Sequence, residues 1–328
     1  MSLADFTLVM PFGNRLRFFN QKFSMPKFHH LRDFVAIARA ESVRSAARSL
    51  GLSQPALTRS LRELELEIGG VLCERHARGV VLTPLGERFL VRAQASLEEL
   101  RRGMEEAAQL AGRMQGQVVA ALSGVPMLTT LPTAFTAFRK AFPEVRLRIV
   151  EGLFPAVEPL LRDGRLDFYL GPRPERTLGA SYRIDLIFKN ERVVLARKNH
   201  PLAAVRSLKG LLGAEWVITG LRGRLEEEFE EQFTALGLEM PRMFTKVESM
   251  LGLLTLLSST DALAFLPRQW AETPLFRDLV QPIPIRETLI APDIVQVIRA
   301  KMPLTPAAEK FSVLLQRAAG KPYKRTLA

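Results

Sequence analysis

The sequence contains little of the chemistry that most enzymes and secreted proteins need. Its 328 residues include one cysteine, Cys73, and four histidines, His29, His30, His76 and His200. A single cysteine cannot form an intramolecular disulfide, which fits a reducing compartment. The histidines and the cysteine have no metal-ligand spacing, and no apolar run approaches the roughly 20 residues of a membrane helix. We therefore expect a cytoplasmic protein without a metal or another cofactor.

The sequence also lacks the common catalytic motifs. It contains no G-x-S-x-G, no H-E-x-x-H and no G-x-x-x-x-G-K. The segment "GPRPERTLG" is broken by proline and has no form that would cradle a phosphate. The acidic residues between 226 and 231 are interpreted as the solvated side of a helix rather than as a catalytic pair. The sequence therefore predicts that the protein is not an enzyme.

Positive charge is what the chain has in excess. The net charge is +12, and the first 92 residues hold 14 basic and 8 acidic side chains, a net +6. A basic balance favours nucleic acid, an acidic membrane surface or acidic ligands as partners. Residues 1–25 include the apolar "LADFTLVMPFG", but neither a preceding basic segment nor a following cleavage site marks a secretory signal. We interpret residues 1–25 as a disordered N-terminal extension upstream of Met25.

Three short helices are predicted at the start of the chain. Residues 28–41, "FHHLRDFVAIARAE", repeat apolar side chains at helical spacing. Ser42 can cap a second helix, which Gly51 ends. Ser53 can cap a third helix, in which Pro55 lies in the first turn, where no backbone hydrogen bond is lost. Two helices joined by a tight glycine-containing turn form the helix-turn-helix pattern.

The third predicted helix has a leucine face and an arginine face. At 100° per residue, Leu57, Leu61, Leu64 and Ile68 lie within about 60° of each other and must face the core. The opposite face and the N-terminus carry Gln54, Pro55, Arg59 and Arg62, with Thr58 on a flank. This face is either a solvated surface or a recognition helix, since Arg pairs with guanine and Gln with adenine in the major groove.

The segment that follows predicts a wing and a long helix. Residues 71–83 read as strand, basic turn and strand, with Arg75, His76 and Arg78 at the tip. From Thr83 to about Gln115 the chain predicts one helix with an apolar heptad seam. The seam consists of Ala93, Leu97, Leu100, Met104, Ala107, Ala111 and Met114. The helix either pairs with a second chain or packs on its own domain.

Residues 117–320 alternate strands and helices, which predicts mostly parallel sheets with helices on both faces. About 200 residues of this pattern suffice for two subdomains. On this part alone, a solute-binding protein of a transport system is an alternative. Residues 321–328, "KPYKRTLA", form a basic tail with no assigned role.

Two stretches resemble LysR-type transcriptional regulators. They are "AARSLGLSQPALTRSLRELE" and "LCERHARGVVLTPLG", which resemble the DNA-binding domain of that family. Further along the chain, "TLLSSTDALAFLP" resembles the effector-binding domain of the same family. The resemblance implies an α+β multidomain protein. Its parts would be a winged helix-turn-helix over 26–86, a linker and dimerisation helix over 87–116, and an effector domain over 117–320. The last would resemble periplasmic binding proteins, with subdomain I at 117–188 and 289–320 and subdomain II at 189–288.

The resemblance also implies partners. These are double-stranded DNA at a promoter or operator, a small effector between the subdomains, further copies of the chain in a dimer or tetramer, and RNA polymerase. The stretch "EGLFPAVEPLLRDGRLDF" is most similar to regulators of aromatic-acid and sulfonate catabolism, which suggests an organic acid or a sulfonate as effector.

The resemblance also implies which residues form the binding sites, carried over by their position in the matching stretches. The DNA-binding set is Ser53, Gln54, Pro55, Thr58, Arg59, Arg62, Arg75 and Arg78. The effector set is Ser123, Gly124, Val125, Met127, Thr129, Gly171, Pro172, Arg173, Thr219, Gly220, Val247, Glu248, Ser249, Phe265 and Pro267. For Ser123 and Thr129 ordinary helix capping is an alternative role, and for Phe265 a place in the core. Two residues depart from the family pattern, the small Cys73 at the base of the wing and the apolar Ala77 at its tip.

Overall fold

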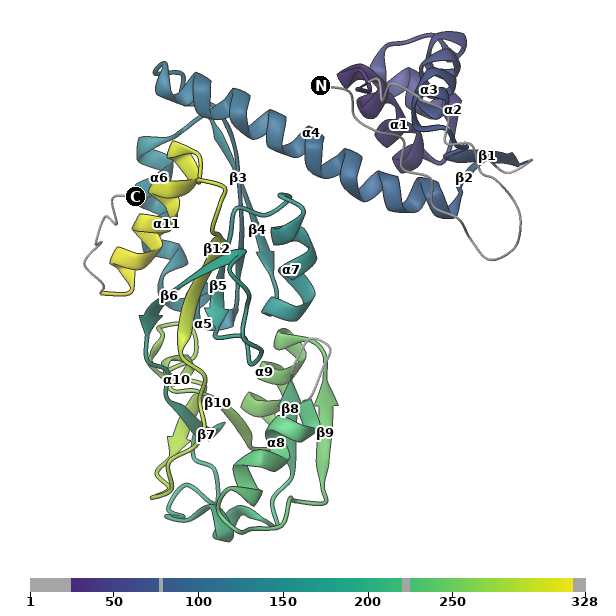
Figure 1. Cartoon of the computed structure of the whole chain (residues 1–328). Coiled ribbons are helices and arrows are strands. Elements are labelled where there is room, and N and C mark those ends of the chain that lie inside the picture. Colours follow the sequence, from purple (N-terminus) through teal and green to yellow (C-terminus); the bar gives the residue numbers. More distant parts are fainter. Residues whose placement is uncertain (1–24, 77–78, 220–224, 321–328) are drawn as a thin grey trace, which may run out of the picture. The chain divides into compact units, whose positions relative to one another are not determined.

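The computed structural model describes residues 25–76, 79–219 and 225–320 (Figure 1). The chain forms two compact units, one up to Leu97 and the other from Glu98 onward. The expectations for the extension 1–24, for the basic tail, and for Ala77, Arg78 and Gly220 lie outside the described residues. No helix in the described part is long and apolar enough to cross a bilayer.

The N-terminal unit begins with the three predicted helices, α1 (Phe28–Ala40), α2 (Val43–Leu50) and α3 (Gln54–Ile68). Ser42 and Ser53 cap α2 and α3, since each side-chain oxygen accepts a backbone N–H of the first turn. Gly51 ends α2 with a φ of +66°, a left-handed conformation in which glycine is unstrained. The predicted caps and breaks therefore form as the sequence indicated.

A two-stranded wing follows α3. Strands β1 (Cys73–His76) and β2 (Gly79–Leu82) are antiparallel. The carboxylate of Glu65 accepts the N–H groups of Leu72 and Cys73 at 2.8 and 3.2 Å, which fixes the start of the wing to α3. On β2, a Cβ at Gly79 would lie 2.4 Å from the carbonyl oxygen of Glu41, so only glycine permits this close approach.

One apolar core holds this unit together. Alternate turns of the three helices contribute side chains that are almost completely buried, and the wing and the following helix close the core. Its members are Phe34, Val35, Ile37, Val43, Ala46, Ala47, Leu57, Leu61, Leu64, Leu72, Cys73 and Ala93. Full burial of such a side chain contributes ~1.5–3 kcal/mol, so this core fixes which face of each helix points outward.

The long helix α4 (Pro84–Leu110) belongs to both units. The hydroxyl of Thr83 caps it by accepting the N–H of Gly86 at 2.9 Å. Gly112, with a φ of +83°, ends the helical turn, and the N–H of Arg113 returns to the carbonyl of Ala108. The helix is therefore about one turn shorter than the predicted end at Gln115.

Subdomain I is built on a five-stranded sheet in the order β4-β3-β5-β12-β6. The strands are β3 (Gly116–Leu122), β4 (Val145–Glu151), β5 (Phe168–Pro172), β6 (Tyr182–Phe188) and β12 (Ile294–Arg299). Helices α6 (Leu131–Ala141) and α11 (Pro306–Ala318) cover one face and α7 (Phe154–Arg162) the other (Figure 1). Short α5 (Gly124–Thr129) follows β3.

Subdomain II contains a three-stranded sheet, β10-β7-β11, and the pair β8-β9. These are β7 (Arg192–Arg197), β8 (Trp216–Thr219), β9 (Phe244–Val247), β10 (Ala264–Pro267) and β11 (Val280–Ile283). Helix α9 (Met250–Ser259) packs on one face of β7 and α8 (Leu225–Thr234) on the other. A 3-10 turn (Leu208–Leu211) and α10 (Gln269–Glu272) complete it.

The expectation of mostly parallel sheets is correct only in part. Strands β4, β3 and β5 are parallel, as are β8 and β9. The pairs β12-β5, β12-β6, β10-β7 and β11-β7 are antiparallel. The chain enters subdomain II after β6 and returns through β12, so the returning strand joins the first sheet from the opposite direction. Periodicity within one strand carries no information about such a crossing.

Candidate DNA interface and effector site

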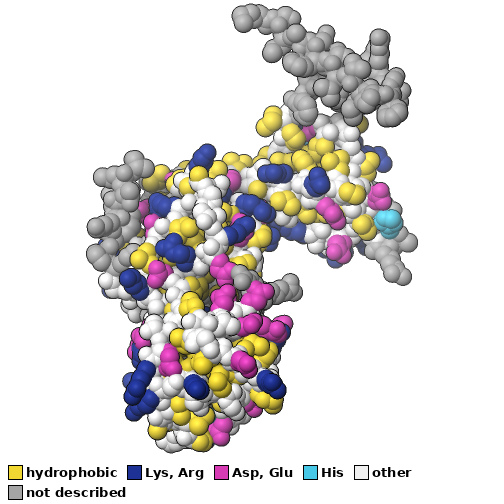
Figure 2. All heavy atoms as spheres, turned by 60° about the horizontal axis from the view of Figure 1, so that its bottom comes forward, with side chains coloured by type: hydrophobic (Ala, Val, Ile, Leu, Met, Phe, Trp, Pro, Cys, Tyr) yellow, Lys and Arg dark blue, Asp and Glu magenta, His cyan; other side chains and the backbone are white. Residues whose placement is uncertain are grey.

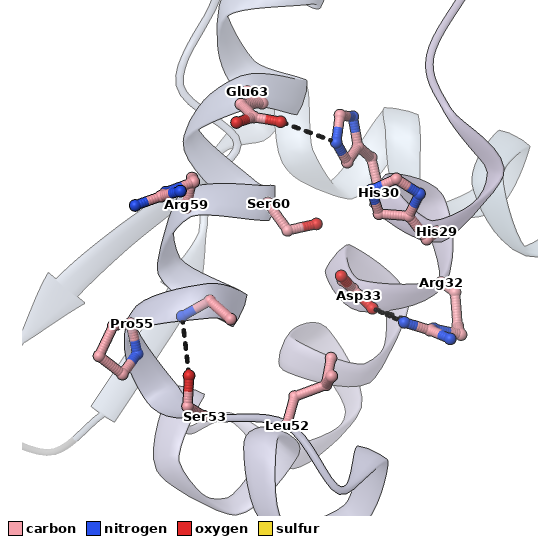
Figure 3. Close-up of a pocket in the computed structure, with 11 residues that line it drawn as sticks. His29, His30, Arg32, Asp33, Leu52, Ser53, Pro55, Arg59, Ser60 and Glu63 are labelled. Atoms are coloured by element: carbon pink, nitrogen blue, oxygen red, sulfur yellow. Dashed lines mark hydrogen bonds and ion pairs between the residues drawn. The ribbon is translucent and has the colours of Figure 1, made fainter.

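The arginine face of α3 is open in the N-terminal unit. Leu57 and Leu64 have no exposed surface, whereas Pro55, Arg59 and Arg62 are exposed. Figure 3 shows Pro55 and Arg59 pointing away from α1. Of the remaining predicted DNA contacts on this helix, Ser53 and Gln54 are exposed and Thr58 is half-buried. The described part of the unit therefore leaves Pro55, Arg59 and Arg62 accessible to a partner.

A polar hollow of about 430 Å³ lies between α1 and α3, next to this face (Figure 3). Almost fully buried His30 bridges two carboxylates of α3, with Nε2 3.1 Å from Glu63 and Nδ1 3.3 Å from Glu67. Ser60 points toward α1, and its buried hydroxyl makes no hydrogen bond to the described residues. These two contacts join α1 to α3 beside the arginine face, a role that the sequence analysis did not predict for His30.

The wing is described only in part. Its strands are present, but the side chain of Arg75 and all of Arg78 lie outside the described residues. The side chain of His76 is about half exposed, and its Nε2 lies 3.7 Å from Oε2 of Glu74. At the base, burial and the nearby negative charge of Glu65 raise the pKa of Cys73 to about 12. Cys73 is therefore a small apolar plug rather than a reactive thiol.

Helix α4 reverses the usual amphipathic pattern in its second half. Its buried side chains are polar, since Arg102 and Gln109 are almost fully covered by the effector unit. Its exposed side chains are apolar, with Met104 67% and Leu100 46% exposed. Single chains rarely leave such a face uncovered. An exposed apolar face on a helix with a heptad seam favours packing of a helix from a second chain against that face.

The predicted seam needs a correction at its start. Ala93 is buried in the core of the N-terminal unit, and Leu97 packs partly against that core. These two residues follow the heptad spacing because α4 closes its own domain there. The exposed part of the seam begins at Leu100 and continues through Met104, Ala107 and, beyond the end of the helix, Ala111.

The structure brings the predicted effector residues of subdomain I together. The chain passes from β3 to β4 on one side of β3 and then from β4 to β5 on the other side. The sheet therefore has a topological switch point between β3 and β5, where ligands bind in open α/β sheets. Ser123 and Gly171 lie opposite each other at the ends of these two neighbouring strands. A Cβ atom at Gly171 would lie 3.0 Å from the Cβ of Ser123. The buried hydroxyl of Ser123 caps no helix N–H and makes no hydrogen bond to the described residues.

Helix α5 ties the two subdomains together. Val125 is buried in the core of subdomain II, among residues of α9 and β7, and Met127 packs on the core of subdomain I. A Cβ at Gly124 would lie 2.8 Å from the ring of Trp270 in α10. Gly124 is therefore required for close contact between the subdomains.

The other predicted effector residues divide into two groups. Phe265 packs on Trp216, Phe229 and Phe233 with ring centroids 4.6–5.5 Å apart, which favours its alternative role in the core. The hydroxyl of Thr129 donates to the carbonyl of Val125 within α5, and that of Ser249 caps α9. Arg173, Glu248 and Ser249 are exposed, Pro172, Val247 and Pro267 are half-buried, and the side chain of Thr219 is not described. No ion pair joins Glu248 to Arg173 in the described part of the chain.

Acidic side chains gather at one place on the visible face of the effector unit (Figure 2). Burial raises the pKa of Glu228 on α8, and the positive charge of Arg192 only partly offsets this effect. Lys246 pairs with Glu226 of the same helix. No group of His, Cys, Asp or Glu side chains among the described residues could hold a metal ion.

This arrangement, a winged helix-turn-helix followed by a two-subdomain α/β unit, defines a ligand-responsive DNA-binding protein. Residues 28–87 match the family model "Bacterial regulatory helix-turn-helix protein, lysR family", and residues 111–320 match "LysR substrate binding domain". The chain belongs to the LysR family of transcriptional regulators. The family consists of regulators, which confirms the expectation that the protein is not an enzyme.

Individual relatives agree with this assignment. The chain is 30% identical over 248 residues to the HTH-type transcriptional regulator GbpR of Rhizobium radiobacter, covering 74% of this chain and 82% of the relative. It is 27% identical over 268 residues to the regulator TdcA of Escherichia coli (strain K12), covering 81% and 84%. Full-length CbnR in complex with its target DNA has a TM-score of 0.65 at 23% identity, covering 89% of this chain and 99% of CbnR.

Proposed function

We propose that the exposed face of α3 reads an operator sequence in the major groove. The observation that carries this proposal is the opposition of buried Leu57 and Leu64 to exposed Pro55, Arg59 and Arg62 on one helix. Ser53, Gln54 and Thr58 complete the reading face, while Arg75 and Arg78 of the wing contact the backbone. The helix-turn-helix match makes a solute-binding transport protein the weaker alternative.

Substitution of Arg59 tests this assignment. Loss of one bidentate base contact costs ~1–3 kcal/mol, so Arg59→Ala should weaken specific binding roughly 5- to 150-fold and relax specificity at one base pair. Gel-shift titration at fixed salt, on duplexes that the wild-type protein selects from random sequence, measures both. Arg88→Ala removes an exposed charge from the same unit outside α3 and should weaken specific and non-specific binding equally. Equal behaviour of the two variants would contradict the assignment.

We further propose that a small organic acid or sulfonate binds at the β3–β5 switch point, between the two subdomains. The buried unpartnered hydroxyl of Ser123 supplies a donor, and exposed Arg173 lies one residue beyond β5 with its positive charge available. Residues at the end of β9, Val247 and Glu248, close the site from subdomain II. We place this regulation in the cytoplasm, where DNA, effector and RNA polymerase at the promoter are present together.

A thermal-shift screen of small carboxylates, sulfonates and sugars tests the effector site. A bound ligand stabilises the folded chain by mass action, so an effective compound raises Tm in proportion to the logarithm of its concentration. Ser123→Ala should abolish most of the shift, while Ser181→Ala, at an exposed position, should leave it intact. A compound that shifts both variants like the wild type would bind elsewhere.

Finally, we propose that the chain forms a dimer through the exposed apolar residues of α4, and a tetramer from two such dimers. Leu100, Met104 and Ala107 supply the first interface. The polar face of the same helix is already covered by the effector unit.

A further inference from the structure

The second half of α4 is held to the effector unit by a buried ion pair. Nη2 of Arg102 lies 3.2 Å from Oδ1 of Asp167, and the two side chains are only 8% and 3% exposed. Nε and Nη2 of Arg102 are buried and make no hydrogen bond to the described residues. Buried pairs are often no more stabilising than apolar residues of the same volume, because both charges lose water. Stability alone is therefore a weak explanation for the pair.

Asp167 is joined to the strand that carries the proposed effector site. Its Oδ2 accepts the N–H of Val119 at 2.7 Å, and its own N–H donates to the carbonyl of Val119 at 2.8 Å. Val119 lies in β3, four residues before Ser123, and Asp167 directly precedes β5, four residues before Gly171. At ~3.3 Å per residue, the carboxylate lies about 13 Å along each strand from the β3–β5 switch point.

Two further contacts flank the ion pair on the same side of α4. Glu99 pairs with Arg299 of β12, and a Cβ at Gly164 would lie 2.5 Å from the Glu99 carboxylate. Gln109 bridges two backbone groups, donating to the carbonyl of Gln115 and accepting the N–H of Ala307 at the start of α11, both at 2.9 Å. The second half of α4 is therefore fixed to subdomain I near both of its ends, through β12 at Glu99 and through the start of α11 at Gln109, with Arg102 and Asp167 between them.

We propose that Arg102 and Asp167 are positioning residues that couple the β3–β5 switch point to α4. Movement of β3 and β5 at the switch point displaces the Asp167 carboxylate, and the buried guanidinium of Arg102 follows it because no other carboxylate among the described residues pairs with it. Since α4 continues without a break from Pro84 to Leu110, the displacement reaches its first half, in the N-terminal unit. The part played by an effector rests on the proposed function, whereas the coupling itself belongs to the ligand-free chain.

Hydrogen exchange of the full-length protein tests the coupling without any ligand. In Arg102→Met, the amides of residues 98–110 and those of 121–124 and 169–172 should all exchange roughly tenfold faster or more, because breaking a buried pair leaves an uncompensated charge. Arg101→Met is the matched control, since the ion pairs of Arg101 within the described residues are to Glu98 and Glu105 of its own helix, and it should affect residues 98–110 alone. Faster exchange in 98–110 with unchanged 121–124 and 169–172 in Arg102→Met overturns the proposal.

Asp167→Asn keeps the test decisive if Arg102→Met does not fold. Asparagine retains an oxygen that accepts the N–H of Val119 but carries no charge, so the variant should fold and still show faster exchange at 98–110. If both regions exchange as in the wild type, the pair has no coupling role.

A compound from the thermal-shift screen separates the coupling from the effector site. In the wild type it should slow exchange at 121–124 and alter exchange at 98–110. In Asp167→Asn it should still slow exchange at 121–124 but leave 98–110 unchanged, and an altered 98–110 in this variant overturns the proposal. Failure of every compound would count against the effector site alone, because the ligand-free comparison decides the coupling by itself.

Discussion

Met104 provides the sharpest test of the dimer, because its side chain is 67% exposed on a helix whose other face is buried. Met104→Ala removes apolar surface from the proposed seam without adding charge, and Met104→Glu places a carboxylate there. Neither change touches a residue in the core of either unit. Both variants should therefore fold like the wild type and differ from it in association.

The magnitude follows from the exposed surface. Complete burial of a Met side chain contributes ~1.5–3 kcal/mol, and about two thirds of this side chain is still exposed in the single chain. Covering the remainder contributes ~1–2 kcal/mol per protomer and ~2–4 kcal/mol per symmetric dimer. Met104→Ala should then raise the Kd of the dimer roughly 30- to 700-fold. Met104→Glu adds the desolvation of two carboxylates and should leave monomers at micromolar concentration.

Sedimentation equilibrium over a range of protein concentrations measures these constants. Met243, in subdomain II, is exposed to the same 67%, so Met243→Glu is a control of identical chemistry and should leave the oligomer unchanged. If Met104→Glu sediments like the wild type while circular dichroism shows both to be folded, the apolar face of α4 is not the dimer interface. Dissociation by both variants would instead implicate the added charge rather than its location.

Two further predictions concern the base of the wing. Glu65→Ala should destabilise the protein by about 2–4 kcal/mol in urea unfolding, because the N–H groups of Leu72 and Cys73 lose their acceptor. Glu65→Gln keeps an oxygen that can accept these N–H groups. If Glu65→Gln loses as much stability as Glu65→Ala, the hydrogen bonds are not the cause. Since burial raises the pKa of Cys73 from 9.0 to about 12, the folded protein at pH 8 should react with a thiol reagent far more slowly than the unfolded chain. The stability that this pKa shift contributes is complete below pH 9 and declines as the pH rises toward 12. Rapid labelling of Cys73 without denaturant would contradict the burial of its thiol. A loss of folding stability already at pH 8 would contradict it as well.

Local signals in the sequence were sufficient for the N-terminal unit. The caps at Ser42 and Ser53, the break at Gly51 and the leucine face of α3 each depend on residues a few positions apart. The structure places Pro55, Arg59 and Arg62 on the outside as helical geometry requires. Such features are encoded within one or two turns, so they can be read without knowledge of the tertiary fold.

The heptad spacing of α4 could not separate two different uses of one stripe. Ala93 and Leu97 close the core of the N-terminal unit, whereas Leu100 and Met104 are exposed. Both pairs satisfy the same periodicity, because a helix shows the same face to whatever covers it. Arg102 and Gln109 carried no apolar signal at all, and their burial depends on Asp167 and on the start of α11, more than 60 residues away in sequence.

Resemblance by position was a mixed guide to the effector site. Ser123 and Gly171 come together at the switch point, which depends on sheet order and could not be derived from either segment alone. Phe265 was assigned to the site by the same resemblance, but its side chain in β10 packs in the aromatic core around Trp216. A strand offers alternate residues to its two faces, so an error in deciding which face lies toward the ligand moves a residue from the site into the core.

The construction of the N-terminal unit limits where regulation can act. Glu65 joins α3 to the wing, the backbone of Glu41 approaches Gly79 of β2, and His30 joins α1 to α3. One core lies beneath these contacts, so the exposed face of α3 and the base of the wing are fixed to the same packed side chains. An effector therefore cannot change DNA binding efficiently by reshaping this unit. The route proposed above is α4, whose first half belongs to the N-terminal unit and whose second half belongs to the effector unit.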